Sequence, residues 1–222
     1  MIRSLFDGIA GIYDRMNRLL SLGMDRRWRR LAANGAAVRP GRVLDLACGT
    51  GDFAFAVARR FPDAEIAGVD LSSAMLDAAR RKNRSARISF AKGDATDLAD
   101  VRDGTFRLCV CAFGFRNFAD RGKALREAGR VLAPGGELAV LEFFRPRNAA
   151  LGFAVSAWTR LVASLFARGR EPAYRYLRES IREMETESGF LSMAAEAGFR
   201  LRRRRWFFPC CTCLHLVNGG MP

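Results

Sequence analysis

The amino-acid sequence predicts an α/β fold in which helices cover both faces of a mostly parallel sheet. Three observations predict it: short apolar runs alternate with helix-like segments five times, a glycine turn joins the first run to the next helix, and two strand-like segments end the chain. Helices that carry the chain back across a sheet make successive strands parallel. The 222 residues, half of them hydrophobic, suffice for one such core, so we expect a single domain.

The elements are expected in a regular order. Apolar residues recur at helical spacing over residues 2–33, which predicts N-terminal helices. Strands are expected near 42–47, 65–70, 87–91, 106–112 and 136–143. Helices are expected between them near 51–61, 73–83 and 119–133, the last of which ends at the Ala-Pro-Gly-Gly turn. The C-terminal part is expected to hold an apolar helix near 149–167, a polar stretch, a helix near 187–197, and an antiparallel hairpin of strands near 200–208 and 211–218, joined around Pro209.

The glycine turn carries the first functional signal. A short apolar strand containing Asp45 leads into Gly49-Thr50-Gly51 and then into helix-forming sequence, an arrangement that lets the backbone approach a nucleotide-like ligand. Asp70 ends the next apolar run, 21 residues after Gly49. A carboxylate at that place can accept hydrogen bonds from both ribose hydroxyls of an adenosine that lies across the strand ends.

Two cofactors fit a turn of this kind. The run Gly49-Thr-Gly51-Asp-Phe-Ala54 matches the dinucleotide pattern Gly-x-Gly-x-x-Gly/Ala, so NAD is one alternative. A carboxylate in the strand, Asp45, suits the cationic amino group of a methionyl moiety better than it suits a pyrophosphate. We therefore favour S-adenosylmethionine over NAD, with a turn that serves only strand-to-helix packing as the plainest alternative.

Charge and hydropathy bear on partners and location. The net charge is +14, nearly all of it from arginine, which predicts attraction to anionic surfaces, phospholipid ahead of nucleic acid, or simply solvated faces. The longest apolar run, residues 149–158, is ten residues long and falls well short of the roughly 18 that a membrane-spanning helix needs. The N-terminus has no signal-peptide core. We expect a cytoplasmic protein with peripheral contact at the inner face of the membrane.

The cysteines are expected to be structural. Residues 210–215 read Cys-Cys-Thr-Cys-Leu-His and suggest a ligand cluster, but a structural zinc site normally has a second, distant pair of ligands. On a strand, Cys211, Cys213 and His215 would share a face that Cys210 does not. We therefore expect no metal site and a structural role for His215. Three further cysteines fall in or beside predicted core strands and are expected to pack as small apolar residues: Cys48, Cys109 and Cys111.

Several motifs in register carry a family resemblance. Four motifs resemble those of the class I S-adenosylmethionine-dependent methyltransferases: Asp45-x-Ala-x-Gly49-Thr-Gly51, Val69-Asp70, Gly93-Asp94-Ala95 and Leu132-Ala-Pro134-Gly-Gly136. From about Phe6 to Phe199, the chain also resembles the ubiquinone/menaquinone biosynthesis C-methyltransferase family. The motifs that carry this resemblance are Tyr13-Asp14-Arg-Met-Asn17, Ser21-Leu-Gly23, Phe113-Gly-Phe-Arg116-Asn117, Leu141-Glu142-Phe143 and Tyr174-Arg-Tyr-Leu-x-Glu-Ser-Ile181.

The resemblance implies a fold and an activity. The fold is a Rossmann-like class I methyltransferase with a seven-stranded, mostly parallel sheet, a C-terminal antiparallel hairpin and N-terminal lid helices. Within a single domain, residues 1–35 would form the lid, 40–145 the cofactor-binding core, and 146–222 the substrate-side helices and the hairpin. The implied activity is methyl transfer from S-adenosylmethionine to the ring carbon of a prenylated quinol, either demethylmenaquinol or a ubiquinol precursor.

The implied cofactor site follows by position. The family commonly has a serine where this chain has Ala112, so one hydrogen bond to the cofactor is in doubt. Other departures are Phe144, where a serine is usual, and the last 15 residues, which bear on the substrate side. The cofactor-binding residues are expected to be Asp45, Gly49, Thr50, Gly51, Asp70, Asp94, Ala95 and Ala112.

Four residues are candidates for catalysis. Arg116 and Asn117 follow the fourth strand, where parallel sheets face their substrates. A guanidinium is no base at neutral pH but can stabilise a phenolate oxygen; the structural alternative is a salt-bridged loop residue. Glu142, at the end of the fifth strand, is either a base or the partner of an arginine. Tyr13 lies four residues before Asn17 on one helix face, which either covers the cofactor and touches the substrate or packs as a plain lid.

Other functions and partners stay open at this point. The basic charge favours another small-molecule or RNA methyltransferase. The glycine turn is also compatible with a NAD-dependent oxidoreductase, and Ala112 with the unusual C-terminus would fit a non-catalytic module on the same fold. The expected partner is the prenylated quinol, with membrane contact and a homodimer as further hypotheses and nucleic acid disfavoured. The helix near 149–167 would sheath a prenyl tail, lie on a membrane or simply pack on the sheet; its large apolar residues are Phe153, Trp158, Leu161, Leu165 and Phe166.

Overall fold

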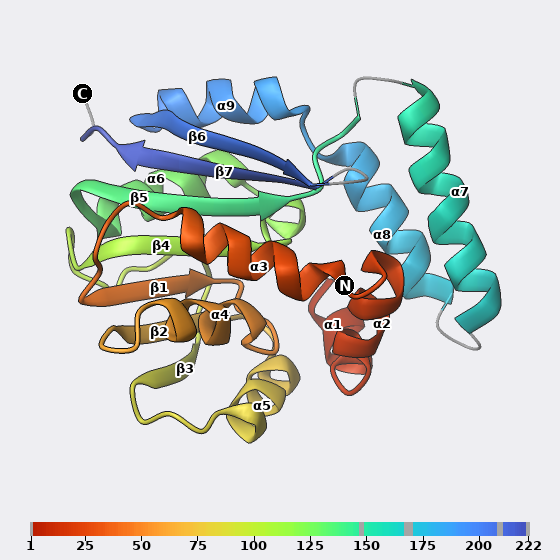
Figure 1. Cartoon of the computed structure of the whole chain (residues 1–222), viewed down its shortest axis with the longest axis horizontal. Helices are drawn as coiled ribbons and strands as arrows, with labels where there is room; N and C mark the ends of the chain where they lie inside the picture. Colours follow the sequence, from red (N-terminus) through yellow and green to blue (C-terminus); the bar gives the residue numbers. More distant parts are fainter. Residues whose placement is uncertain (1, 147–148, 167–170, 208–210, 221–222) are drawn as a thin grey trace.

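A computed structural model describes residues 2–146, 149–166, 171–207 and 211–220. One sheet runs in the strand order β3-β2-β1-β4-β5-β7-β6 (Figure 1). The first five strands pair in parallel, and β7 pairs antiparallel with β5 and with β6. The strands are β1 (Arg42–Leu46), β2 (Glu65–Asp70), β3 (Ile88–Lys92), β4 (Phe106–Ala112), β5 (Leu132–Glu142), β6 (Phe199–Phe207) and β7 (Cys211–Asn218).

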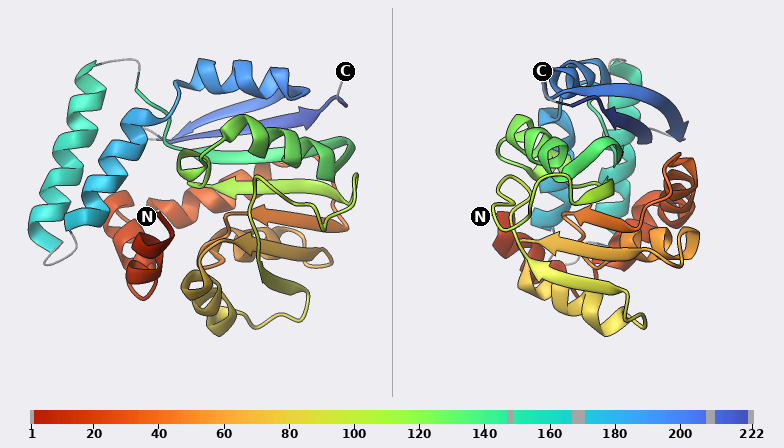
Figure 2. Two further views of the ribbon diagram at one scale, coloured as in Figure 1. Left: turned by 180° about the vertical axis from the view of Figure 1, so that it is seen from behind. Right: turned by 90° about the vertical axis from the view of Figure 1, so that its left-hand side faces the viewer.

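The predicted sheet is therefore confirmed, including the antiparallel C-terminal pair; the turn expected around Pro209 lies outside the described residues. Strand side chains alternate between the two faces of the sheet. Figure 2 shows, from behind and from the side, the helical layers that cover these faces. Val43 packs with α3 and α4 on one face, whereas its neighbour Leu44 packs with α6 on the other. The helices of the two layers are α3 (Met24–Gly35), α4 (Asp52–Arg60) and α5 (Ser73–Lys82), and then α6 (Arg121–Val131) and α9 (Glu187–Glu196).

A cap of helices covers the carboxyl ends of the parallel strands, on the right of Figure 1. The helical pattern over residues 2–33 resolves into three helices, and the last break comes at Leu22 and Gly23, which both have left-handed backbone, with φ of 52° and 75°. The cap has its own apolar cluster, which joins Ile9, Met16 and Tyr174 from its different helices. Its helices are α1 (Ile2–Ile9), α2 (Tyr13–Ser21), α7 (Ala149–Phe166) and α8 (Glu171–Glu183).

Two expectations about elements were wrong. The stretch taken as polar contains α8, whose buried or partly buried Tyr174, Leu177 and Ile181 recur at helical spacing, so an amphipathic signal was present. Strand β5 begins at Leu132, before the glycine turn and not after it. A register shift in the pairing of β4 with β5 accommodates the extra residues. Within the described residues, no helix combines the length and apolarity needed to cross a membrane.

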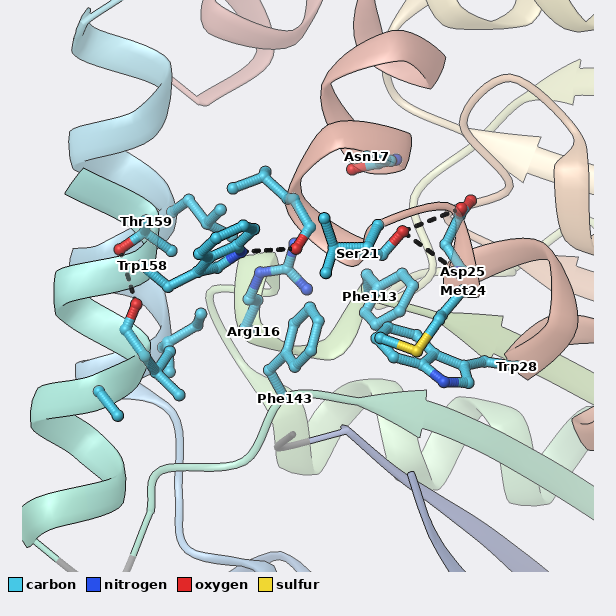
Figure 3. Close-up of a pocket in the computed structure, with 16 residues that line it drawn as sticks. Asn17, Ser21, Met24, Asp25, Trp28, Phe113, Arg116, Phe143, Trp158 and Thr159 are labelled. Atoms are coloured by element: carbon cyan, nitrogen blue, oxygen red, sulfur yellow. Dashed lines mark hydrogen bonds between the residues drawn. The ribbon is translucent and has the colours of Figure 1, made fainter. Parts of the chain in front are cut away.

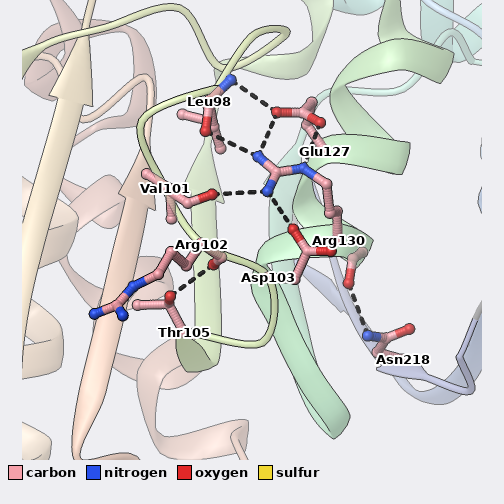
Figure 4. A network of polar contacts seen from close by, with 9 residues as sticks. Leu98, Val101, Arg102, Asp103, Thr105, Glu127, Arg130 and Asn218 are labelled. Atoms are coloured by element: carbon pink, nitrogen blue, oxygen red, sulfur yellow. Dashed lines mark hydrogen bonds and ion pairs between the residues drawn. The ribbon is translucent and has the colours of Figure 1, made fainter.

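Two polar networks fasten the sheet away from the cap. Before β4 begins, the Arg130 guanidinium bonds to the carbonyls of Leu98 and Val101 and to the carboxylates of Asp103 and Glu127 (Figure 4).

In the second network, buried Glu137 of β5 accepts hydrogen bonds from the Ala37 N–H at 2.9 Å and from Arg202 at 2.9 Å. Its Oε1 also lies 2.5 Å from His215 Nδ1. Burial acts to raise the pKa of Glu137, but these partners outweigh it and lower the pKa. A side-chain carbon at Gly35 would lie 2.3 Å from His215 Nε2, so only glycine lets α3 end here.

Candidate active site

The predicted glycine loop joins β1 to α4 at the carboxyl edge of the sheet. Ala47, Gly49 and Gly51 all have left-handed backbone, with φ of 51°, 54° and 82°, which turns the chain sharply from strand to helix. A side-chain carbon at Gly51 would lie 2.8 Å from Cζ of Phe90. The loop therefore needs glycine both for its conformation and for its packing.

Asp45 is buried beneath this loop with half of its carboxylate unused. Its Oδ2 accepts a hydrogen bond from the Ala54 N–H at 2.9 Å, while Oδ1 has no partner. Burial raises the pKa of Asp45 to about 8. A small cavity of about 20 Å³ lies beside it, lined also by Tyr13, Thr50 and Ala112. An unsatisfied buried carboxylate oxygen facing a cavity is suited to a cationic group.

Asp70 ties the glycine loop to the end of the neighbouring strand. Its two oxygens accept hydrogen bonds from the Gly49 N–H at 2.8 Å and the Ser72 N–H at 2.9 Å. Asp94 follows the next strand and caps a turn by accepting from the backbone and hydroxyl of Thr96, both at 2.8 Å. Asp70 and Asp94 thus stand at adjacent strand ends, while the side chain of Ala95, next to Asp94, is buried in the core.

The lid helix α2 lies directly on the glycine loop. A side-chain carbon at Gly49 would be 3.9 Å from Cε1 of Tyr13, so the tyrosine ring packs over the glycine. The Thr50 hydroxyl donates to Asp14 at 2.6 Å, and Lys82 donates to the same carboxylate at 2.8 Å. Burial acts to raise the pKa of Asp14, but these hydrogen bonds outweigh it and lower the pKa. The lid therefore meets the cofactor loop through both a packed ring and a charged contact.

A larger cavity of about 270 Å³ lies on the other side of the lid (Figure 3). Its wall is mostly apolar, and the Trp158 ring of α7 closes it by donating to the Leu20 carbonyl of α2 at 2.9 Å. Arg116 lines this cavity four residues after Ala112, which lines the small cavity. Both cavities therefore lie near the carboxyl end of β4. The aromatic side chains of the large cavity are Trp28, Phe113, Phe143 and Trp158.

Arg116 is held by Glu142 in a buried ion pair. Their side chains are 2.7 Å apart and only 7% and 0% exposed, and Phe113 and Phe143 stack at 4.8 Å between ring centroids beside them. Burial acts to lower the pKa of Arg116, but Glu142 outweighs it and raises the pKa, so the guanidinium stays charged. Its Nε is buried without a partner. Of the two roles expected for Glu142, its position therefore matches the partner of an arginine. Its side chain is fully buried, so it has no exposed atom to act as a base.

Asn117 and Tyr13 occupy different places from the ones expected of a single cluster. The Asn117 amide donates to the Phe113 carbonyl at 3.1 Å and accepts from the Tyr176 hydroxyl at 2.8 Å, so both of its ends are engaged inside the protein. Tyr13 lines the small cavity, whereas Asn17, on the same helix, lines the large one. Sequence reasoning did not single out Tyr176 as the partner of Asn117, although the Tyr-Arg-Tyr run in α8 carried a signal.

The cysteines and His215 do not assemble a metal centre in the part of the chain that the structure describes. Cys211 and Cys213 pack in the apolar core, and Cys213 Sγ lies 3.4 Å from His215 Nε2. Cys210 lies outside the described residues. His215 is bound on its other nitrogen by Glu137, which gives it the structural role expected of it.

The residues present fit S-adenosylmethionine. The loop glycines leave the backbone accessible, Asp45 offers a free carboxylate oxygen for a cationic amino group, and Asp70 stands at the strand end where a ribose is held. Ala112 supplies no hydrogen bond, as its sequence position indicated. When bound, this cofactor supplies a methyl group on a sulfonium, which is already electrophilic.

Comparison with known proteins agrees with this chemistry. Residues 1–217 match the ubiE/COQ5 methyltransferase family. A demethylmenaquinone methyltransferase of Thermus thermophilus is 45% identical over 204 residues, which cover 89% of this chain and 92% of that protein. Another from Deinococcus radiodurans is 43% identical and covers 93% and 88%. A SAM-dependent methyltransferase structure from Aquifex aeolicus, 16% identical, shares the fold with a TM-score of 0.60 over 80% of this chain and 81% of its own.

These findings confirm the family, the class of enzyme and the cofactor, and they set aside the NAD-dependent oxidoreductase and the non-catalytic module. The chain belongs to the ubiE/COQ5 methyltransferase family, and it transfers a methyl group from S-adenosylmethionine.

Proposed function

We propose that the protein methylates the ring carbon of a prenylated quinol, with demethylmenaquinol as the acceptor. One observation carries the proposal: the apolar cavity ends on a permanently charged guanidinium, Arg116, at the strand end where the cofactor cavity also lies. An acceptor that is apolar over most of its length and carries one ionisable ring oxygen matches a wall of this kind. Both named relatives are demethylmenaquinone methyltransferases.

Arg116 would stabilise the quinol oxygen as it loses its proton, which makes the neighbouring ring carbon nucleophilic. Preorganised charge of this kind acts strongly in a site that excludes water. Glu142 would act through Arg116, because the ion pair fixes the guanidinium of a residue that lines the cavity. The stacked Phe113 and Phe143 would align the flat ring and exclude water. Asn117 would position Tyr176 and the Phe113 carbonyl and stay clear of the acceptor.

The prenyl tail would follow the apolar wall toward α7 and α2. Large apolar side chains there face solvent: Phe153 is 74% exposed, Leu22 69% and Leu161 50%. We propose that this surface touches the membrane that holds the prenylated acceptor, because exposed aromatic and aliphatic groups on α7 and at the end of α2 favour the interface. Leu165 and Phe166, also expected on this helix, have side chains outside the described residues.

The test is methylation of a short-chain demethylmenaquinol with S-adenosylmethionine, with the product's methyl position read by NMR. Ala154 lines the cavity, so Ala154→Trp should raise the KM for the quinol roughly tenfold, the equivalent of about 1.4 kcal/mol of lost apolar contact, while cofactor affinity stays unchanged. Ala157→Trp, on the same helix but outside the cavity wall, is the matched control. Methylation on oxygen, or equal effects of the two variants, would refute the proposed acceptor site.

A further inference from the structure

A third cavity, of about 600 Å³, which we call the basic cavity, lies among α2, α3, α4 and the segment that links α5 to β3. It shares only Arg29 and Asp52 with the small cofactor cavity. Among its described lining residues, Asp52 is the one acid. A concave surface with one dominant sign of charge concentrates the electrostatic potential inside it. The cations that line it are Arg18, Arg26, Arg29, Arg59, Lys82 and Arg84.

Two of these cations are neutralised within the protein. Lys82 Nζ lies 2.8 Å from Asp14 and 2.7 Å from Asp52, and Arg29 lies 2.7 Å from Asp25. The two Lys82 pairs connect α5 with α2 and α4, and the Arg29 pair lies within α3. They leave the remaining cations of the cavity without a carboxylate.

Four guanidinium groups are left over. Arg18, Arg26, Arg59 and Arg84 join no ion pair within the described parts of the chain, and Arg84 donates only to backbone carbonyls. Arg18 Nε is buried with no hydrogen-bond partner. Buried donors are almost always satisfied in native proteins, so this one indicates an acceptor that comes from outside the chain.

We propose that this cavity binds a phosphate group, either in the headgroup of an anionic phospholipid or in a soluble phosphate ester. Guanidinium forks match the oxygens of phosphate in both charge and spacing. The aromatic lining residue, Phe55, packs edge-on against Phe90 at 6.0 Å and has Lys82 over its ring, so its ring is already engaged within the protein, which favours a phosphate over a stacked nucleic-acid base.

The site lies next to the route of the prenylated acceptor. The α2–α3 hairpin is a wall between the two cavities: Asn17 and Trp28 face the apolar one, whereas Arg18 and Arg26 face the basic one. Leu22, exposed at the tip of that hairpin, lines the apolar cavity. A headgroup held by the arginines would place lipid chains beside the apolar cavity. The phosphate site itself does not depend on which acceptor the enzyme methylates.

The test is binding of pyrophosphate by calorimetry, and of phosphatidylglycerol against phosphatidylcholine vesicles by sedimentation, at one ionic strength. Arg26→Ala with Arg59→Ala removes two unpaired, exposed cations of the cavity and should weaken binding roughly tenfold or more. Arg107→Ala with Arg203→Ala removes the same charge from exposed positions outside the cavity and should change affinity less than about twofold.

The two probes separate the sources of the phosphate. Binding to pyrophosphate that also displaces the protein from phosphatidylglycerol vesicles assigns both sources to this cavity. Vesicle binding alone assigns the headgroup, and pyrophosphate binding alone assigns a soluble ester. Equal loss in the two double variants would reduce the effect to the net charge of +14 and overturn the proposal, as would the absence of binding to either probe. No readout uses methyl transfer, so failure here and failure of the proposed acceptor are distinguishable.

Discussion

Arg116 and Arg130 stand at opposite ends of β4 and differ in how completely they are bound. The guanidinium of Arg130 makes five hydrogen bonds, to two carbonyls and two carboxylates, before the strand begins. That of Arg116, after the strand ends, makes one side-chain ion pair with Glu142 and keeps a buried Nε without a partner. An arginine whose donors are all taken fastens the chain, whereas one with a donor to spare beside a cavity is available to a ligand.

The same contrast separates the two ends of the sheet. Asp45 Oδ1, unpartnered and buried, also lies at the carboxyl end. The amino end, by comparison, has paired groups such as Arg130 with Glu127, which raise the pKa of the arginine and lower that of the glutamate. Unsatisfied polar atoms are costly, so their concentration at one edge marks the edge that meets ligands.

The sharpest test of the contrast is Arg116→Lys, compared with Arg130→Lys. Lysine keeps a charge opposite Glu142 but loses the planar fork, so the single-turnover rate of methyl transfer should fall about 10²–10³-fold. Affinity for S-adenosylmethionine should hardly change, because the loss falls on the developing charge. Arg130→Lys should leave the rate alone. Equal rates of methyl transfer for the two variants would show that Arg116, like Arg130, has only a structural role.

The complementary test is the stability of Arg130→Ala. Loss of its hydrogen bonds to Leu98, Val101 and two carboxylates should lower the free energy of unfolding by roughly 2–3 kcal/mol, measured by urea denaturation. Cofactor affinity and the rate of methyl transfer by the folded variant should equal those of the parent. An Arg130→Ala variant that is as stable as the parent but transfers the methyl group slowly would contradict a structural role for Arg130 and a catalytic role for Arg116.

The smallest effect is expected at Asp45. Its carboxyl has a pKa raised from 3.8 to about 8 by burial, so the folded state holds its proton, and this group's contribution to stability falls as the pH rises through that window. A cationic amino group should favour the carboxylate, so cofactor binding near neutral pH should release a proton.

Calorimetry in buffers of different ionisation enthalpy measures that release. Asp45→Asn should abolish it and flatten the dependence of stability on pH between 3.8 and about 8. An unchanged proton release in the variant would assign it to another group.

Short-range patterns predicted the cofactor end of this molecule well. The strand, glycine turn and helix around Asp45 and Gly49 follow one another directly along the chain, from Arg42 to Arg60, so their local sequence sets their geometry. The pairing of Arg116 with Glu142 joins the ends of two strands, 26 residues apart, and the sequence left the role of Glu142 open between base and partner. Only the register of β4 against β5 decides it.

Other features depended on tertiary placement in the same way. The helical pattern of the N-terminus did not fix where its helices would break. The break falls at Leu22 and Gly23, where glycine favours the left-handed conformation and leucine rarely adopts it. The basic cavity draws Arg18, Arg59 and Arg84 from three separate elements, so no local motif announces it. From the sequence these arginines were expected on solvated faces. Only the structure shows that they line one cavity and, within the described chain, lack carboxylate partners there.

The hydrogen bond from Thr50 to Asp14 bears on the order of events in a catalytic cycle. Because α2 lies on the glycine loop and Tyr13 covers Gly49, we expect the methyl donor beneath the lid and the acceptor in the apolar cavity on the lid's other face. The lid helix α2 is itself part of the wall of the apolar cavity, where Trp158 is bonded to Leu20. We expect the enzyme to load its donor first and its acceptor second, and to release the methylated product before the spent donor, so that S-adenosylhomocysteine competes with the donor alone.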